Sequence, residues 1–122
     1  MLTLARASLA ALIALSLAGS GAFAADQPPL KIGMITTLST AGGYLGEDMR
    51  DGLQLAVDEE NGKLGGVPVQ IVIEDDGLKP ANGKQIADKF LLQDKIKLFT
   101  GIIYSNVALA VVPSVIEAGA FT

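Results

Sequence analysis

The residues best suited to binding chemistry are Ser105 and Asn106, which follow an apolar run at residues 98–103 and the aromatic Tyr104. They stand where a predicted strand gives way to a predicted helix. Ser and Asn are preferred at helix starts, where they cap free backbone N–H groups. The same hydroxyl, amide and N–H groups also form an anion site that suits a carboxylate. The sequence is compatible with a cap, with a carboxylate site, and with both together.

A second polar pair, Asp75 and Asp76, follows the predicted strand 67–74. Two adjacent carboxylates without a third ligand make a poor metal site. A phospho-acceptor role is disfavoured because the chain carries the export signal described below. Asp side chains bond backbone N–H groups in turns and at helix starts. We therefore expect this pair to organise its turn and to cap the next helix.

A loop at residues 37–46 carries Gly42, Gly43 and Gly46. These glycines lie six or more residues beyond the preceding strand and lack the spacing of a dinucleotide-binding fingerprint. The loop is either a flexible surface loop or a ligand-contacting loop whose glycines let the backbone approach closely.

Composition excludes several classes of function. The chain has 122 residues, a formal net charge of −4, and no Cys, His or Trp. It therefore cannot form a thiol nucleophile, a disulfide, a zinc finger or a Ser-His-Asp arrangement. An acidic chain with 5% aromatic residues is a poor nucleic-acid binder, which needs a basic face. We find no catalytic constellation, and we expect a protein that is not an enzyme and uses no cofactor.

Short apolar runs alternate with segments of helical periodicity along residues 30–122. The pattern predicts strands at 30–36, 67–74 and 98–103, helices beginning near Glu47, at Pro80 and at Val107, and the opening of a fourth strand at 120–122. Strands that alternate with helices form a parallel sheet covered by helices on both faces. The predicted fold class is therefore α/β, and the uncovered edge predicts a fragment of a larger lobe.

Residues 1–24 differ from the rest of the chain. Arg6 is followed by an apolar run at 7–18, and Ala22-Phe23-Ala24 places small residues at −3 and −1 of a cleavage site. This is the pattern of a secretory signal peptide. The run is 12 residues long, short of the roughly 20 residues that span a bilayer. We expect cleavage between Ala24 and Ala25, and export of the mature protein.

The mature sequence resembles the periplasmic solute-binding proteins of ABC importers, in particular the branched-chain amino-acid (Leu/Ile/Val) group with the type I fold. The resemblance rests on an ordered set of short motifs: the signal peptide, Leu30-Lys31-Ile32-Gly33, the loop ending at Gly46, Glu60-Asn61-Gly62, Gly65-Gly66-Val67-Pro68-Val69, Glu74-Asp75-Asp76 with Pro80, and Thr100-Gly101 before Ser105. It implies that residues 25–122 form the first part of the N-terminal α/β lobe of a longer protein.

The resemblance also implies site residues. In that family the Ser after the third strand bonds the α-carboxylate of the ligand, and Ser105 matches it, with Tyr104 and Asn106 beside it. The first loop of the family usually reads Ser-Gly-Pro and places an aromatic residue before its closing glycine. Here the loop reads Ser39-Thr40-Ala41, and Leu45 precedes Gly46 with Tyr44 one place earlier. Tyr44 and Leu45 are therefore the candidates for contact with the ligand side chain.

The implied function is binding of a small solute with a carboxylate, a branched-chain amino acid or a related organic acid, and its delivery to an ABC permease in the inner membrane. Three alternatives stay open at this point. One is an extracytoplasmic sensor of the same fold that feeds a regulator. Another is a secreted enzyme with catalytic residues beyond Thr122. The third is a truncated product without function.

The signal pattern yields a first prediction: periplasmic material should begin at Ala25. Signal peptidase recognises the small residues at 22 and 24, so replacing Ala24 by a bulky residue should leave the precursor uncleaved. N-terminal sequencing of the exported protein and of this variant checks both outcomes. Exported protein that begins at Met1 would contradict the prediction.

Overall fold

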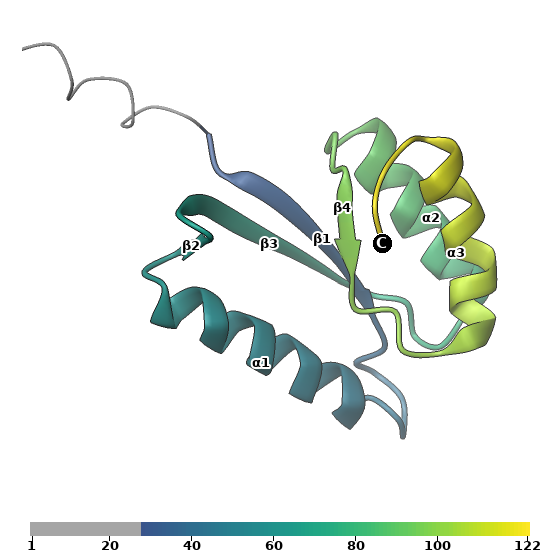
Figure 1. Cartoon of the computed structure of the whole chain (residues 1–122). Coiled ribbons are helices and arrows are strands. Elements are labelled where there is room, and N and C mark those ends of the chain that lie inside the picture. Colours follow the sequence, from purple (N-terminus) through teal and green to yellow (C-terminus); the bar gives the residue numbers. More distant parts are fainter. Residues whose placement is uncertain (1–27) are drawn as a thin grey trace, which may run out of the picture.

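The computed structural model describes residues 28–122. The predicted signal peptide, with its cleavage site between Ala24 and Ala25, lies outside the described residues. The described part consists of one sheet with helices on both of its faces (Figure 1). This arrangement confirms the predicted α/β class.

The sheet has the strand order β2-β3-β1-β4. Three of its strands are parallel, as predicted: β1 (Leu30–Thr36), β3 (Val67–Asp75) and β4 (Leu98–Thr100). The two-residue strand β2 (Lys63–Leu64) is antiparallel to the start of β3 and was not predicted. Gly65 and Gly66 form its turn with φ of 57° and 81°, a backbone region that glycine enters without strain. The sheet is therefore mixed rather than purely parallel.

The chain re-enters the sheet at Phe121, beside β4. Phe121 forms a parallel bridge with Leu98. Its N–H donates to the Lys97 carbonyl at 2.9 Å, and its carbonyl accepts from the Phe99 N–H at 2.8 Å. The predicted strand opening at 120–122 is thus present as a single bridge next to β4.

Three helices cover the sheet: α1 (Tyr44–Glu59), α2 (Pro80–Leu92) and α3 (Ser105–Glu117). Helix α1 lies on one face, and α2 and α3 lie together on the other (Figure 1). Pro80 occupies the start of α2 as predicted, where its missing N–H costs no hydrogen bond. Helix α3 ends at Glu117 and is closed by a Schellman motif, in which Gly119 has a φ of 65° and the N–H of Ala120 donates to the Val115 carbonyl.

Three predicted boundaries were wrong. Helix α1 begins at Tyr44 rather than near Glu47, because Gly43 already has the helical φ and ψ of −61° and −26°. Helix α3 begins at Ser105 rather than at Val107. Strand β4 ends at Thr100 rather than at residue 103, because Gly101 turns the chain with φ of 92°.

The main core lies between the sheet and the helices α2 and α3. The residues of α2 that face this core are buried and recur at helical spacing: Gly83, Ile86, Ala87, Phe90 and Leu91. They pack with Ile35 and Phe99 of the sheet and with the three buried valines of α3, Val107, Val111 and Val115. The tight packing of this layer fixes the start of α3 and therefore the position of Ser105.

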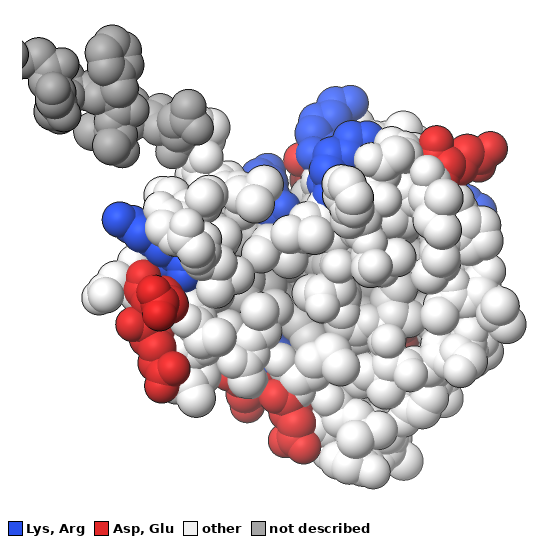
Figure 2. Space-filling view, viewed as in Figure 1, with Lys and Arg blue, Asp and Glu red and all other residues white. Residues whose placement is uncertain are grey.

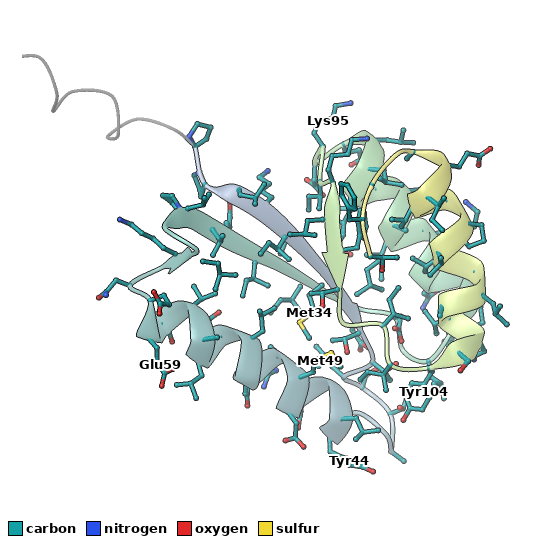
Figure 3. The ribbon with its side chains drawn as sticks, in the orientation of Figure 1. Met34, Tyr44, Met49, Glu59, Lys95 and Tyr104 are labelled. Atoms are coloured by element: carbon teal, nitrogen blue, oxygen red, sulfur yellow. The ribbon has the colours of Figure 1, made fainter. Side chains whose placement is uncertain are left out.

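The α1 side is less completely covered. Val57 is buried, but Met49 is 42% exposed although it points toward the sheet and Met34 (Figure 3). The outer surface of α1 is acidic, and the area over β4 and α3 is almost free of charge (Figure 2). Among residues 28–122, no helix is long and apolar enough to cross a membrane.

Pro113 lies inside α3, at its ninth position. A proline in this segment predicts either a kink or a helix that begins late enough to place the proline in its first turn. The second alternative is wrong, because α3 begins at Ser105. The ring nitrogen of Pro113 cannot donate to the carbonyl of Leu109. The Leu109 side chain is 78% exposed, so the freed carbonyl lies on the solvent side, where water can satisfy it. The kink itself stays a prediction.

We therefore predict that Pro113→Ala raises the free energy of unfolding by about 1–3 kcal/mol, because it restores a helical hydrogen bond and removes the ring. Urea unfolding of the two proteins measures the change. The matched control is Ser114→Ala, one residue further along α3, which should shift stability by less than about 0.5 kcal/mol. Loss of stability in Pro113→Ala would show that the proline is needed where it stands.

Candidate functional site

Three loops meet at the carboxyl edge of the sheet. They follow β1, β3 and β4 and lead into α1, α2 and α3 respectively. In parallel α/β sheets this edge is where ligands bind. The candidate residues lie on the first and third loops, and the aspartate pair lies on the second.

Asp76 joins the ends of β1 and β3. It is 1% exposed. Its Oδ1 accepts hydrogen bonds from the Thr37 hydroxyl at 2.5 Å and from the Leu78 N–H at 2.8 Å. Its own N–H donates to the Thr36 carbonyl at 3.0 Å. Asp76 therefore fixes the start of the first loop and closes the turn that leads to α2.

Asp75 holds the next residue of the same loop. Its Oδ1 accepts from the N–H groups of Leu38, at 2.9 Å, and Gly77, at 2.8 Å. Burial opposes ionisation of this carboxyl, but hydrogen bonds from the Ser39 hydroxyl and from the backbone outweigh it, so the pKa of Asp75 is lowered below its usual value. The turn-forming role predicted for the pair is confirmed. The predicted helix cap is wrong, because α2 begins with Lys79 as its N-cap residue and has no side-chain cap bond.

Tyr104 connects the third loop to the first. Its hydroxyl donates to the Gly42 carbonyl at 3.4 Å. A Cβ atom at position 42 would lie 1.9 Å from the Tyr104 hydroxyl oxygen, so a side chain there would displace the phenol. The ring also packs against the core between the sheet and α3. Tyr104 therefore contacts both the first loop and the core, and its role in ligand binding stays a prediction.

Ser105 and Asn106 are exposed at the amino end of α3. Tyr104 is the N-cap residue, and α3 has no side-chain cap bond. The interpretation of Ser105 or Asn106 as the helix cap is therefore wrong. The Tyr104 carbonyl accepts from the N–H groups of Val107 and Ala108. Within residues 28–122, the N–H groups of Ser105 and Asn106 have no acceptor, so the helix start presents free donors.

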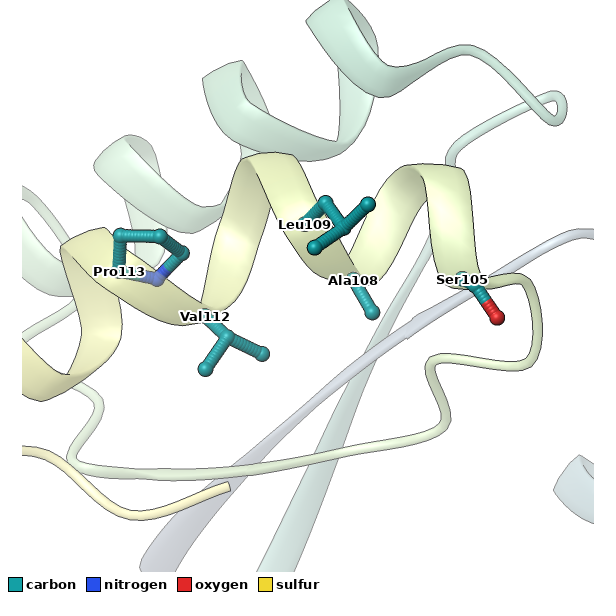
Figure 4. Close-up of a pocket in the computed structure, with 5 residues that line it drawn as sticks. All are labelled: Ser105, Ala108, Leu109, Val112 and Pro113. Carbon is teal, nitrogen blue, oxygen red and sulfur yellow. The ribbon is translucent and has the colours of Figure 1, made fainter.

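A groove of about 380 Å³ begins at Ser105 and runs along α3 (Figure 4). Its lining residues repeat at helical spacing: Ser105, Ala108, Leu109, Val112 and Pro113. Ser105 is the only one of these with a polar side chain. The groove therefore combines an apolar floor with one hydroxyl at its end.

Tyr44 and Leu45 lie on the first turn of α1, at the same end of the molecule as Tyr104 (Figure 3). Tyr44 is 61% exposed and Leu45 is 38% exposed. Gly46 between them and the sheet is buried, and a Cβ there would lie 2.0 Å from the Thr37 carbonyl. Within residues 28–122, no hydrogen bond joins Tyr44 or Leu45 to Ser105. The role of these two residues as ligand contacts stays a prediction.

Sequence reasoning missed the roles of Thr37 and Leu38 at this edge, and it did not predict that Gly42 contacts Tyr104. Their partners are 37 to 62 residues away in the chain. A glycine in a loop and a tyrosine before a helix carry no signal that they touch. Residues 28–122 contain no cluster of three or more acidic, Cys or His residues that could hold a metal ion.

With this geometry established, comparison with known proteins defines the class. A periplasmic binding protein family model matches residues 29–122. The chain belongs to this family. Leu/Ile/Val-binding protein BraC3 of Rhizobium johnstonii is 34% identical over 92 residues, which are 74% of this chain and 25% of that protein.

Two solved structures are also similar. A solute-binding protein of an ABC transporter from R. palustris, in complex with benzoate, is 32% identical with a TM-score of 0.72 over 76% of this chain and 26% of that one. The branched-chain amino-acid binding protein LivJ of Streptococcus pneumoniae, in complex with isoleucine, is 27% identical with a TM-score of 0.70 over 76% and 27% of the two chains. The chain spans about a quarter of the length of these relatives.

The lowered pKa of Asp75 yields a prediction about acid stability. The ionised carboxylate contributes stability above its unfolded pKa, near 3.8, and this contribution is lost as pH falls through the lower folded pKa. Asp75→Asn should therefore be less stable than wild type at neutral pH, and the difference should narrow below about pH 4.

Urea unfolding at several pH values measures this narrowing. The control is Asp48→Asn on α1, whose carboxylate accepts no hydrogen bond among the described residues. It should show no such convergence. A difference between wild type and Asp75→Asn that stays constant down to about pH 2 would contradict the assigned cause.

Proposed function

We propose that this protein is an extracytoplasmic solute-binding protein that binds a small carboxylate and delivers it to an ABC importer. The observation that carries the proposal is the uncapped start of α3. Ser105 presents a hydroxyl there together with two free backbone N–H groups, at the sheet edge where ligands bind in this class of fold. Free donors at a helix start favour an anion.

The ligand class follows from the surroundings of Ser105. The groove along α3 is apolar apart from Ser105, so it suits an apolar part of the ligand. Two similar proteins were solved with benzoate and with isoleucine. Benzoate joins a carboxylate to an apolar ring, and isoleucine carries a carboxylate, an ammonium group and an apolar side chain. We therefore infer a branched-chain amino acid or an aromatic acid as the ligand, with the carboxylate on Ser105.

The remaining parts of the proposal concern place and partner. Membership of the periplasmic binding protein family and the secretory pattern of residues 1–24 support a periplasmic location. In the proposed cycle, ligand binding closes two lobes, and the closed form docks on a permease of the inner membrane. No step of this cycle requires a reaction, so the protein acts without catalysis and without a cofactor.

Ser105→Ala tests the proposal in the protein expressed from its complete gene. A hydrogen bond to a charged group contributes about 1.5–3 kcal/mol, so affinity should fall by roughly 10- to 150-fold. Stability should stay within about 0.5 kcal/mol of wild type, because Ser105 makes no cap bond. Calorimetric titration with leucine, isoleucine and benzoate, together with thermal melts, measures both quantities.

Ser114→Ala is the matched control, since it makes the same change on the same helix away from the sheet edge. It should leave affinity unchanged. Equal affinity of Ser105→Ala and wild type for a bound probe would remove Ser105 from the site. Failure of the wild-type protein to bind any of the three probes would contradict the proposed ligand class.

A further inference from the structure

We propose that Tyr104 is a positioning residue that holds the turn at Gly42 against the amino end of α3 and so sets the spacing between the first loop and Ser105. We call the contact of Tyr104 with Gly42 the phenol clasp. The proposal deepens the proposed function and rests on it for its effect on ligand affinity, but not for its effect on the loop.

The first step is how the loop is held. Its start is fixed by Asp75 and Asp76 through Leu38 and Thr37. Its far end has no such anchor on the β3 side. Within residues 28–122, the bond from Tyr104 to Gly42 is the one side-chain hydrogen bond that joins this loop to the segment before α3. The loop is therefore attached at its start to the turn after β3, through Asp75 and Asp76. Further along it is attached to the segment before α3, through Tyr104.

The second step is the shape of the contact. The hydroxyl oxygen and Cζ of Tyr104 lie 1.9 Å and 3.0 Å from where a Cβ at position 42 would be. Gly42 does not have a positive φ, so alanine suits its backbone. The three atoms nearest to that Cβ all belong to the phenol. A side chain at 42 therefore forces the phenol to move, and the turn itself does not demand glycine.

The third step is the position of the clasp relative to the ligand groups. Tyr104 directly precedes Ser105 in the chain, so its position sets that of the free N–H groups at the start of α3. Gly42 lies two residues before Tyr44, at the start of α1, and its carbonyl accepts from the Leu45 N–H at 3.2 Å. The clasp therefore connects the two candidate ligand-contacting segments. Without it, the binding-competent arrangement is only part of the population, and apparent affinity falls by that fraction.

The experiment is a double-mutant cycle in the protein expressed from its complete gene. Gly42→Ala should lower the melting temperature when Tyr104 is present. It should have almost no effect in a Tyr104→Ala background, where the obstructing ring is gone. Additive effects of the two changes would overturn the clasp.

Hydrogen exchange measures the loop directly. Removing the phenol should accelerate exchange at Gly43 and Leu45, whose amides close the turn, by about tenfold. Tyr104→Phe, which keeps the ring, tests the hydroxyl if Tyr104→Ala fails to fold. Val111→Ala is the control: it weakens the core of α3 and should not accelerate these two amides selectively. Unchanged loop exchange in a folded Tyr104→Ala variant would overturn the proposal.

Ligand titration separates this proposal from the proposed function. For a probe carboxylate that the wild-type protein binds, Tyr104→Ala and Gly42→Ala should each weaken affinity by about three- to tenfold. Val111→Ala should not. Accelerated loop exchange with unchanged affinity would reject the positioning role. If wild type binds none of the probes, the proposed function fails, and exchange and the mutant cycle alone decide whether the clasp exists.

Discussion

The carboxylate of Asp76 is the interaction on which the carboxyl edge of the sheet depends. It is buried, and it accepts bonds from both the end of β1 and the turn after β3. A buried charge without partners is costly, whereas one that satisfies several donors stabilises the arrangement that supplies them. One donor lies on the loop after β1 and the other on the loop after β3. The position of each loop therefore depends on the other through Asp76. The register between β1 and β3 brings Thr36 opposite Asp75 and so places the donors in reach.

The two faces of the sheet play different parts. The layer formed by α2 and α3 is a closed apolar core and positions the amino end of α3 against the sheet. The α1 layer is less closed, with Leu45 and Met49 partly exposed. Of the two segments that meet at the candidate site, the start of α3 is therefore the rigid one. The first loop takes its place from polar contacts and from the phenol of Tyr104 rather than from apolar burial.

Local sequence patterns predicted the parts of the fold that local physics decides. The start of α2 at Pro80 and the parallel strands β1, β3 and β4 follow from propensity and periodicity. The predicted start of α1 was too late in the chain. Gly43 already has helical backbone angles, and no capping residue in the sequence marks this position. The sequence left open whether Ser105 caps α3, because a Ser before a helix is ambiguous until the backbone shows which residue is the cap. The partnership of Tyr104 with Gly42 spans 62 residues and has no local signature.

The glycine at position 42 has a consequence for how this sequence can change. Its φ is not positive, so the turn itself admits alanine, and the atoms nearest to a Cβ there belong to Tyr104. A side chain at 42 therefore displaces the phenol, whereas a small residue at 104 leaves room for it. An alignment of relatives should accordingly show covariation of these two columns.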